Sequence, residues 1–453
     1  SGAIALGYQA GYCGQSSFSI SVGFNSGRSS QLQNCVAIGQ AAGYTSQSVN
    51  SIAIGYQSGY EFQDQNSIAV GYSAATSSQG ASAVAIGNTA GTINQGTSSV
   101  AIGDAAGYSS QLTYAVSIGC QAGYKLQADY SVAIGYQAGY TFQQSNSVAI
   151  GNQAGYELQL NNSVAIGNQA GYTNQGVSTV AVGDGAGSLN QGTTSVSVGY
   201  QSGYCGQGSQ SVAIGNSAGQ INQFTYTVAV GSQSGQTNQG MGCTSIGANS
   251  GNSNQATGAV ACGINSGYID QGMGAVAIGM NCAADTQGDE AVAIGFAAGF
   301  EAQSMWGYIA VGAMAGSTNQ GQSSICIGYY AGNDTQTSDA IAIGTFAGAT
   351  TQSINCIAIG NQAGKSSQSE SSIAIGTNAG LNTQSDNAIA MGSLAGYTTQ
   401  GTMSTAIGYY AGNNNQSDYA VAVGSYSGEE SQGISSVAIG INSGQNNQGS
   451  SCV

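Results

Sequence analysis

The stretch Ser147–Gln175 reads SVAIGNQAGYELQLNNSVAIGNQAGYTNQ, which is one sixteen-residue phrase followed by most of the same phrase again. We take the glycine that ends each SVAIG-like phrase as position zero. These glycines recur every sixteen residues from Gly7 to Gly295 and, after one step of seventeen, from Gly312 to Gly440. They divide the 453 residues into 28 rungs. Such a period predicts a repeat architecture in which each copy is stable only when it is stacked on the next.

The residues before each marker glycine have the pattern of a strand. Position −1 is apolar in every rung, and position −3 is Val or Ile except at Thr244 and Thr405. Side chains alternate along a strand, so these two columns share one face. Position −2 lies on the other face and is always Ala, Ser or Cys, as in Ala149 and Ser117. Because neither face varies freely, we expect both faces of this strand to be buried.

A corner follows the strand. Position +3 is again always small, and position +4 is Gly except at Ala75 and Ala283. Glycine allows a positive φ or a close backbone approach, although the two alanines suggest that a positive φ is not needed in every rung. The candidate corner glycines include both the position-zero and the position +4 glycines, and their central copies are Gly135, Gly139, Gly151, Gly155, Gly167 and Gly171.

Position +8 is the most restricted polar column, because it is Gln in every rung. An amide that never varies is expected to be buried and to bind a turn backbone and the Gln one rung away. Such amide ladders occur in stacked strands. The predicted structural ladder includes Gln15, Gln31, Gln47, Gln63, Gln159 and Gln175.

Together these columns predict an all-β chain, a parallel β-solenoid (β-roll) of about 28 coils of sixteen residues. Glycine twice per rung and β-branched strands disfavour helix. We expect residues 1–453 to form one continuous array, with a one-residue insertion near 304–308, and to be a piece of a longer chain. Large side chains on one strand face and small ones on the other suggest that one face lines the coil and the other packs on a partner. Lateral association of copies, with a homotrimer favoured, is the resulting prediction.

Composition excludes several classes of function. The net charge is −15, and the only cations, Arg28, Lys125 and Lys365, are too few and too far apart to hold a phosphate backbone. There is no His, so Ser-His and Cys-His nucleophiles cannot form. Carboxylates do not recur in one column, which argues against a calcium ladder or an acid/base pair. We therefore expect no catalytic site, no metal, no cofactor, no nucleic-acid binding and no insertion of this segment into a membrane.

The SVAIG phrases resemble the head repeat of YadA-like trimeric autotransporter adhesins, and similar repeats occur in phage and large-virus fibre proteins. The matching stretches include SVAIGYQAGY from Ser131, SVAIGNQAGY from Ser163 and SIAIGTNAG from Ser372. The resemblance covers essentially the whole chain and implies a left-handed parallel β-roll in a trimer. The head repeat of that family is shorter, however, and its pattern lacks the Gln at +8 and the Gly-Tyr at +4 and +5.

Two aromatic features carry hypotheses. A candidate aromatic contact strip at position +5 consists of Tyr108, Tyr124, Tyr140, Tyr156 and Tyr172. It could bind a partner or merely stiffen a corner by stacking, and we favour stacking. The only tryptophan, Trp306, lies in the seventeen-residue step and is a candidate bulge contact, although a tolerated insertion is the simpler interpretation.

The ten cysteines fall in unlike columns, which argues against a disulfide framework. Cys262, Cys282 and Cys326 occupy small or apolar columns and are interpreted as buried hydrophobic residues. A disulfide between Cys243 and Cys262 on neighbouring coils is conceivable.

Three functions then compete. The favoured one is a non-enzymatic structural fibre or adhesin shaft, extracellular or on a cell or virion surface, whose rigid rod resists proteases and mediates attachment or assembly. Its partners would be copies of itself and a host-surface protein or glycan. A self-assembling extracellular filament subunit is the alternative, and an ice-binding solenoid is a weaker one, because no column is consistently Thr. A glycan-processing enzyme would need clustered acids on one face.

Overall fold

The computed structural model describes residues 2–301 and 306–453. Gln303, which is the position +8 glutamine of the rung at Gly295, lies outside the described residues, as does part of the predicted insertion near 304–308. The chain divides into two compact units, Ser1–Tyr226 and Thr227–Val453. The described residues of both units form only strands, turns and the short segments that join them. Each unit is a parallel β-solenoid with a sixteen-residue repeat, which confirms the predicted fold class, and the 28 marker glycines delimit about 27 turns.

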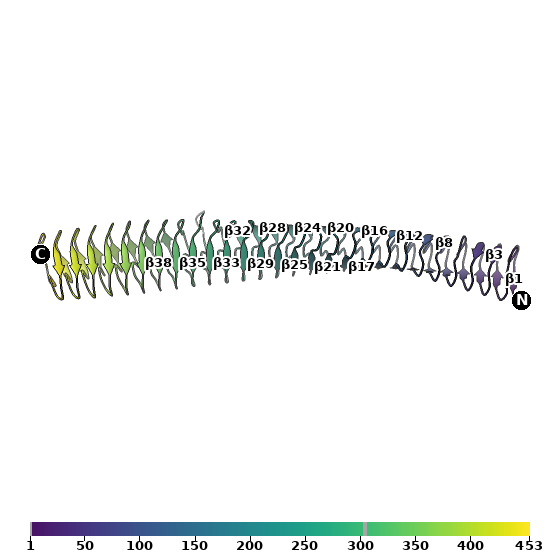
Figure 1. Ribbon diagram of the computed structural model, residues 1–453, viewed down its shortest axis with the longest axis horizontal. Helices are drawn as coiled ribbons and strands as arrows, with labels where there is room; N and C mark the ends of the chain where they lie inside the picture. The colour runs from purple at the N-terminus through teal and green to yellow at the C-terminus, as the bar shows by residue number, and fades with distance from the viewer. Residues whose placement is uncertain (1, 302–305) are drawn as a thin grey trace. The chain divides into compact units, whose positions relative to one another are not determined.

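Within each unit, every rung contributes a first strand at positions −3 to −1, which pairs in parallel with the first strand of the next rung of that unit. Val148, Ala149 and Ile150 face Val164, Ala165 and Ile166, a register of sixteen residues. Most rungs add a second short strand that ends at the Gln of position +8, as Gln143 facing Gln159 shows. Within each unit, rungs that follow one another in sequence are therefore neighbours in space (Figure 1).

In the first unit the first strands are β1 (Ile4–Leu6), β2 (Ile20–Val22), β4 (Val36–Ile38), β6 (Ile52–Ile54), β7 (Ile68–Val70), β9 (Val84–Ile86), β11 (Val100–Ile102), β13 (Val116–Ile118), β15 (Val132–Ile134), β17 (Val148–Ile150), β19 (Val164–Ile166), β21 (Val180–Val182), β23 (Val196–Val198) and β25 (Val212–Ile214). Its second strands are β3 (Ser29–Gln31), β5 (Thr45–Gln47), β8 (Ser77–Gln79), β10 (Ile93–Gln95), β12 (Ser109–Gln111), β14 (Lys125–Gln127), β16 (Thr141–Gln143), β18 (Glu157–Gln159), β20 (Thr173–Gln175), β22 (Leu189–Gln191), β24 (Cys205–Gln207) and β26 (Ile221–Gln223).

In the second unit the first strands are β27 (Val228–Val230), β29 (Thr244–Ile246), β31 (Val260–Cys262), β33 (Val276–Ile278), β34 (Val292–Ile294), β35 (Ile309–Val311), β36 (Ile325–Ile327), β38 (Ile341–Ile343), β40 (Ile357–Ile359), β42 (Ile373–Ile375), β44 (Ile389–Met391), β46 (Thr405–Ile407), β48 (Val421–Val423) and β50 (Val437–Ile439). Its second strands are β28 (Thr237–Gln239), β30 (Ser253–Gln255), β32 (Ile269–Gln271), β37 (Thr335–Gln336), β39 (Thr351–Gln352), β41 (Ser367–Gln368), β43 (Thr383–Gln384), β45 (Thr399–Gln400), β47 (Asn414–Gln416) and β49 (Glu430–Gln432).

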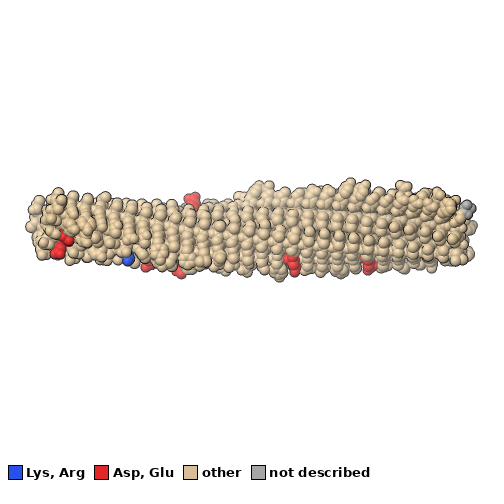
Figure 2. All heavy atoms as spheres, turned by 90° about the horizontal axis from the view of Figure 1, so that it is seen from below, with Lys and Arg blue, Asp and Glu red and all other residues tan. Residues whose placement is uncertain are grey.

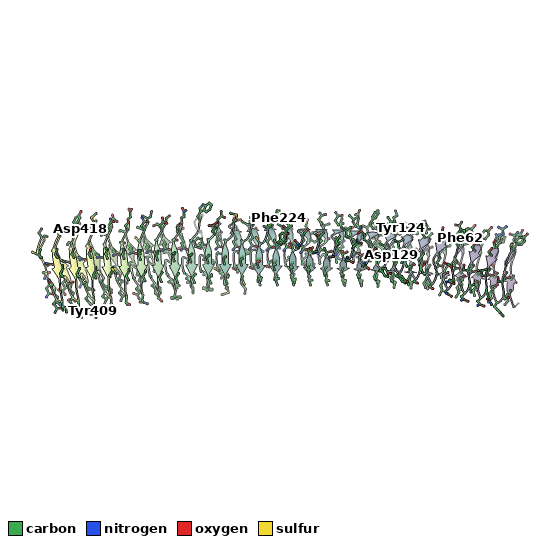
Figure 3. All side chains as sticks on the ribbon, viewed as in Figure 1. Phe62, Tyr124, Asp129, Phe224, Tyr409 and Asp418 are labelled. Atoms are coloured by element: carbon green, nitrogen blue, oxygen red, sulfur yellow. The ribbon has the colours of Figure 1, made fainter. Side chains whose placement is uncertain are left out.

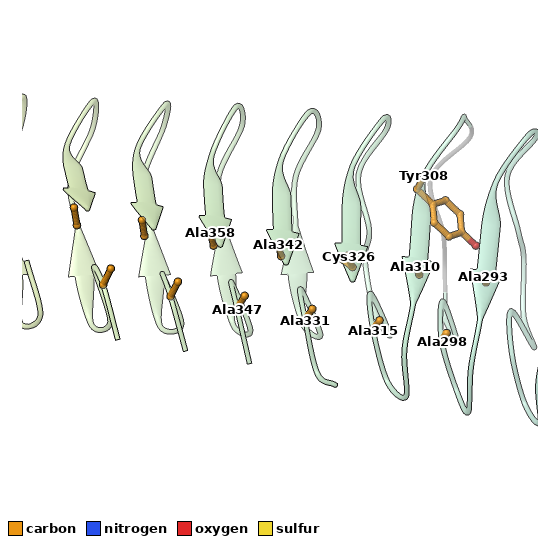
Figure 4. Packing of buried hydrophobic residues seen from close by; sticks show 14 of the residues in the cluster. Ala293, Ala298, Tyr308, Ala310, Ala315, Cys326, Ala331, Ala342, Ala347 and Ala358 are labelled. Carbon is orange, nitrogen blue, oxygen red and sulfur yellow. The ribbon is translucent and has the colours of Figure 1, made fainter. Parts of the chain in front are cut away.

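The core of each unit is made of small side chains. Ala149 at position −2 and Ala154 at position +3 are fully buried and belong to one continuous alanine cluster of the first unit. The second unit has the same arrangement, with Cys326 replacing an alanine (Figure 4). The first strand, through position −2, forms one wall of the coil, and the corner, through position +3, forms the facing wall. A single methyl group from each wall fills the space between them, so the two walls lie close together. No Val or Ile could enter this space without forcing the walls apart.

The large aliphatic side chains consequently lie on the outside. The strand β17 is buried only at Ala149, while Val148 and Ile150 are partly exposed. Ile54 and Ile118, both at position −1, are each 37% exposed. The prediction that both faces of the first strand are buried is therefore right for the inner face and wrong for the outer face of the chain by itself.

Candidate functional site

The glutamines at position +8 tie the interior of each unit together. The side-chain nitrogen of Gln47 donates to the backbone oxygen of Val36 in its own rung at 2.9 Å and to the side-chain oxygen of Gln63 in the next at 3.1 Å. Gln31 makes the same pair of bonds, to Ile20 and Gln47. Their side chains are almost fully buried, whereas Gln15 in the first rung is partly exposed. This column holds the fold together.

The amide ladder is interrupted at more than one place in the first unit, and the interruption between Gln159 and Gln175 is one of them. Gln159 donates to Val148 and Ser163, and Gln175 donates to Val164 at 2.8 Å. The side-chain oxygen of Gln175, however, is buried without a hydrogen-bond partner among the described residues. The predicted Gln-to-Gln bond therefore occurs in many rungs but not between these two.

The glycine at position zero is required both by its conformation and by lack of space. Gly151 has a φ of +133°, a region that side-chain-bearing residues avoid, and a Cβ placed on it would collide with the carbonyl oxygen of Gly167. Gly135 and Gly167 have the same conformation. Position zero thus brings the backbones of successive rungs into direct contact.

The corner glycine at position +4 is constrained as well. Gly155 has a φ of +53°, and a Cβ there would lie 2.7 Å from the side-chain oxygen of Gln159. Gly139 and Gly171 share this conformation. Ala75 and Ala283 in the same column also have positive φ, 47° and 44°. The prediction that rungs with alanine at position +4 do not need a positive φ is therefore wrong, since both alanines adopt the strained conformation.

The tyrosines at position +5 form a continuous stack in the first unit. Ring centroids of Tyr108, Tyr124, Tyr140, Tyr156 and Tyr172 lie 4.9–5.0 Å apart, with interplanar angles of 13°, 5°, 2° and 8°. All five are partly buried. Burial, followed by the neighbouring tyrosines, raises the pKa of Tyr124 and Tyr156. Much of each ring face is covered by the next ring, so the stack offers a partner mainly its edges.

The seventeen-residue step places two aromatic residues on opposite sides of the wall. Trp306 is 51% exposed, and the backbone nitrogen of Gly307 donates to Asp289 in the preceding rung at 2.9 Å. Tyr308 is fully buried among Ala293 and its neighbours, in the column at −4 that is otherwise Ser, Ala, Cys or Thr (Figure 4). Sequence reasoning selected Trp306 and missed Tyr308, although its size in a small-residue column was the available signal.

The cysteines are all free thiols. Cys282 and Cys326 are fully buried, as predicted, and burial raises the pKa of the Cys282 thiol to about 12. Cys262 is only partly buried, because position −1 points outward. The thiol of Cys243 lies inside and donates to the backbone oxygen of Ala256. The suggested disulfide between Cys243 and Cys262 is therefore wrong, since the two residues lie on opposite faces.

The outward side chains at positions −3 and −1 form what we call the aliphatic strip, which runs along the first strands of each unit. It consists of Val or Ile in nearly every rung, and its position −1 residues include Ile86, Ile118, Ile214 and Ile246. These four are 37–43% exposed. A regular apolar surface of this kind is a candidate interaction site.

A second surface was not predicted. Three concavities of about 520, 250 and 360 Å³ lie end to end in the first unit, and all are lined by positions +7 to +10. Leu112 borders the first two, and Leu158 borders the second and third. We call this continuous surface, from Ser46 to Ser209, the axial groove. Position +7 varies from rung to rung, so the sequence columns gave no sign of it.

Charged groups are sparse on these surfaces, and the face shown in Figure 2 carries only scattered ones. The three cations lie over aromatic rings: Arg28 over Tyr44 at 5.2 Å, Lys125 over Tyr124 at 5.7 Å, and Lys365 over Phe346 at 5.3 Å. Within residues 2–301 and 306–453, no three Cys, Asp or Glu side chains gather as metal ligands could. The same residues include no helix with the length and apolar character needed to cross a bilayer.

Comparison with models of known protein families gave no match, and comparison with curated proteins gave none either.

Proposed function

We propose that this protein is a non-enzymatic structural shaft displayed on a cell or virion surface, in which copies of the chain associate laterally as a homotrimer. The rod would supply length, stiffness and resistance to proteases, and it would serve attachment or assembly. The resemblance of the SVAIG phrases to adhesin heads and viral fibres supports a surface location.

The aliphatic strip is the observation that carries this proposal. The interior of each rung is filled by small side chains and one amide, so the Val and Ile side chains have no place inside the chain. Taking one such side chain from full exposure to full burial contributes roughly 1.5–3 kcal/mol. The strip offers two side chains per rung, and since position −1 residues such as Ile86 and Ile118 are only 38% and 37% exposed, association would supply part of that amount for each. A second copy has the same rung spacing, so its own strip would match this surface rung by rung.

Light scattering combined with negative-stain imaging tests the proposal. We expect stiff particles of three times the 44.7 kDa chain mass. The substitutions Ile86→Gln, Ile118→Gln and Ile214→Gln together should release single chains, because they place polar groups in the interface.

A matched control uses the same change on the second strands. Ile93, Ile221 and Ile269 are 37–40% exposed at position +6, and Ile→Gln there should leave the trimer intact. A monodisperse wild-type monomer would end the proposal of self-association. Open-ended filaments would instead identify the chain as a self-assembling filament subunit.

A further inference from the structure

The axial groove follows from the backbone conformation of the second strand. Residues at position +7 have positive φ, for example 54° at Leu126, 57° at Phe142 and 59° at Leu158. The chain therefore turns sharply between positions +6 and +8, and the turn leaves its outer surface concave. Since every rung repeats the turn in register, the concavities join into one groove along the direction in which the rungs stack. From Ser46 to Ser209 it is roughly 50 Å long at about 4.8 Å per rung.

The lining of the groove is apolar in the middle and polar towards both ends. Leu126, Phe142 and Leu158 are 47%, 49% and 37% exposed in its central part. Hydroxyl and amide groups follow on either side, among them Ser78 and Asn94 before the centre and Asn174 and Asn190 after it. Phe62, which Figure 3 labels, adds a second aromatic ring and is 62% exposed.

The charge of the groove limits what it can bind. Its lining contains one carboxylate, Asp64, and no cation. The chain as a whole carries −15. A polyanion would be repelled over the whole length, and a polycation would find a single counter-charge. An uncharged occupant fits this lining best.

Backbone groups of the groove at positions +8 and +9 are already hydrogen-bonded between rungs. The nitrogens of Gly80, Leu112 and Ala128 at position +9 donate to the carbonyl oxygens at position +8 of the next rung, at 2.8–2.9 Å. An added peptide strand would find no free ladder in the groove, so strand addition does not explain it. The side chains must supply recognition. The side-chain nitrogen of the exposed Asn174 donates to the side-chain oxygen of Asn190 at 2.9 Å, and an amide nitrogen carries two hydrogens that can be donated.

We propose that the axial groove binds a neutral, extended polysaccharide of β-1,4-linked hexoses, lying along the direction in which the rungs stack. A straight β-linked chain advances by about one sugar per rung, since a sugar residue is similar in length to the rung spacing of about 4.8 Å. The C–H faces of the sugars pack on Phe142, because an aromatic face attracts the slightly positive C–H groups, and they make apolar contact with the aliphatic Leu126 and Leu158. The hydroxyl and amide groups towards both ends bond the sugar hydroxyls.

This inference does not depend on the proposed fibre role, because the groove and the aliphatic strip belong to different strands of the rung. Glycan affinity and particle mass are therefore independent measurements, and either proposal can fail alone.

Isothermal titration calorimetry with cellohexaose and chitohexaose tests the proposal on the full chain. We expect at least one of them to bind, and a hexamer of polygalacturonate to give no heat. The variant Leu126→Ser, Phe142→Ser, Leu158→Ser should lose about tenfold or more in affinity, because it removes the apolar floor. Its residues are 37–49% exposed, so its thermal unfolding is measured beside that of the wild type, and the affinities are compared at a temperature at which both are folded.

The matched control is Tyr114→Ser, Tyr130→Ser, Tyr136→Ser, three residues that are 50–59% exposed in the same part of the unit but outside the groove. Its affinity should change by less than about twofold. The proposal is overturned if neither neutral hexamer binds, if the control loses as much affinity as the groove variant, or if polygalacturonate binds as well. A drop in particle mass caused by the groove variant would also overturn it, since a second copy would then occupy the groove.

Discussion

The side-chain nitrogen of Gln143 donates a hydrogen bond to the side-chain oxygen of Gln159, one rung further along the chain, over 3.0 Å. The same nitrogen donates to the backbone oxygen of Val132 in the first strand of its own rung, over 2.9 Å. One buried amide therefore joins the two strands of a rung and joins that rung to the next. Any side chain that lacks both a donor and an acceptor would leave polar groups stranded in the interior.

We predict that Gln143→Ala lowers the free energy of unfolding by about 2–4 kcal/mol, because it strands the oxygens of Val132 and Gln159 and leaves a cavity. Urea denaturation measures the loss. Gln144→Ala removes a partly exposed amide in the next position and should cost less than about 0.5 kcal/mol. Equal effects of the two changes would contradict a structural role for the ladder.

Gly151→Ala should destabilise the chain by about 3–5 kcal/mol, since the new Cβ meets the carbonyl oxygen of Gly167 in a backbone region reserved for glycine. Gly185 provides the control. It has a φ of +65° at position +2, where Ala105 shows that alanine fits, and the nearest atoms to an added Cβ lie 3.4 Å away. Gly185→Ala should change stability by no more than about 1 kcal/mol, as measured by the same denaturation.

Alkaline pH should weaken the tyrosine stack. The pKa of Tyr124 and Tyr156 is raised in the folded chain above the usual value of about 10, first by burial and then by the neighbouring tyrosines. The unfolded chain then loses these protons at lower pH than the folded chain. The stabilisation of the folded chain that comes from these two protonated tyrosines is complete below about pH 10. It is lost as the pH rises through the pKa that Tyr124 and Tyr156 have in the folded chain.

Thermal unfolding midpoints at pH 8 and between about pH 10 and 11.5 measure this loss. Tyr124→Phe with Tyr156→Phe keeps the stacked rings but removes the two protons, so its midpoint should fall less over that range. Tyr114→Phe with Tyr130→Phe keeps Tyr124 and Tyr156 and should fall as the wild type does. A wild-type midpoint that stays constant up to pH 11.5 would argue against the raised pKa.

Thiol labelling should separate the cysteines by burial. Cys13 and Cys452 are exposed and should react with a maleimide within minutes at about pH 7.5. Cys282 should not react in the folded chain, because it is fully buried and its pKa is raised to about 12. Peptide mass spectrometry with and without denaturant locates the labels. Labelling of Cys282 as fast as Cys13 in the folded chain would contradict the narrow interior.

Tyr308→Ala should destabilise the second unit by about 3–5 kcal/mol, because it empties the largest buried side-chain site near the seventeen-residue step. Trp306→Ala removes an exposed ring two residues away and should cost less than about 1 kcal/mol. Urea denaturation of both variants compares them directly. If the tryptophan change proved the more costly, Tyr308 would not be the residue that fills this step.

The sequence by itself determined the period, the parallel stacking, the first strand and the buried column at position +8. Each of these features can be seen in single columns of the repeat. Alternation with period two defines a strand. The column that contains Gln47 is invariant, which is expected only where the surroundings of the side chain are the same in every rung. A repeat of sixteen residues also leaves few ways to stack, so strand register followed from the spacing of Gly151 and Gly167.

The tertiary structure alone decided which face of the first strand lies inside, where the axial groove lies, and that Tyr308 rather than Trp306 enters the core. Each of these depends on how far apart the two walls of the coil stand once the turns have closed, a distance that no single column reveals. The walls close to the width of two alanines, such as Ala149 and Ala154, and this places the aliphatic strip and Cys262 outside and Cys282 inside. The positive φ of Ala75 has the same cause, since closure of the ring imposes the corner whatever residue occupies it.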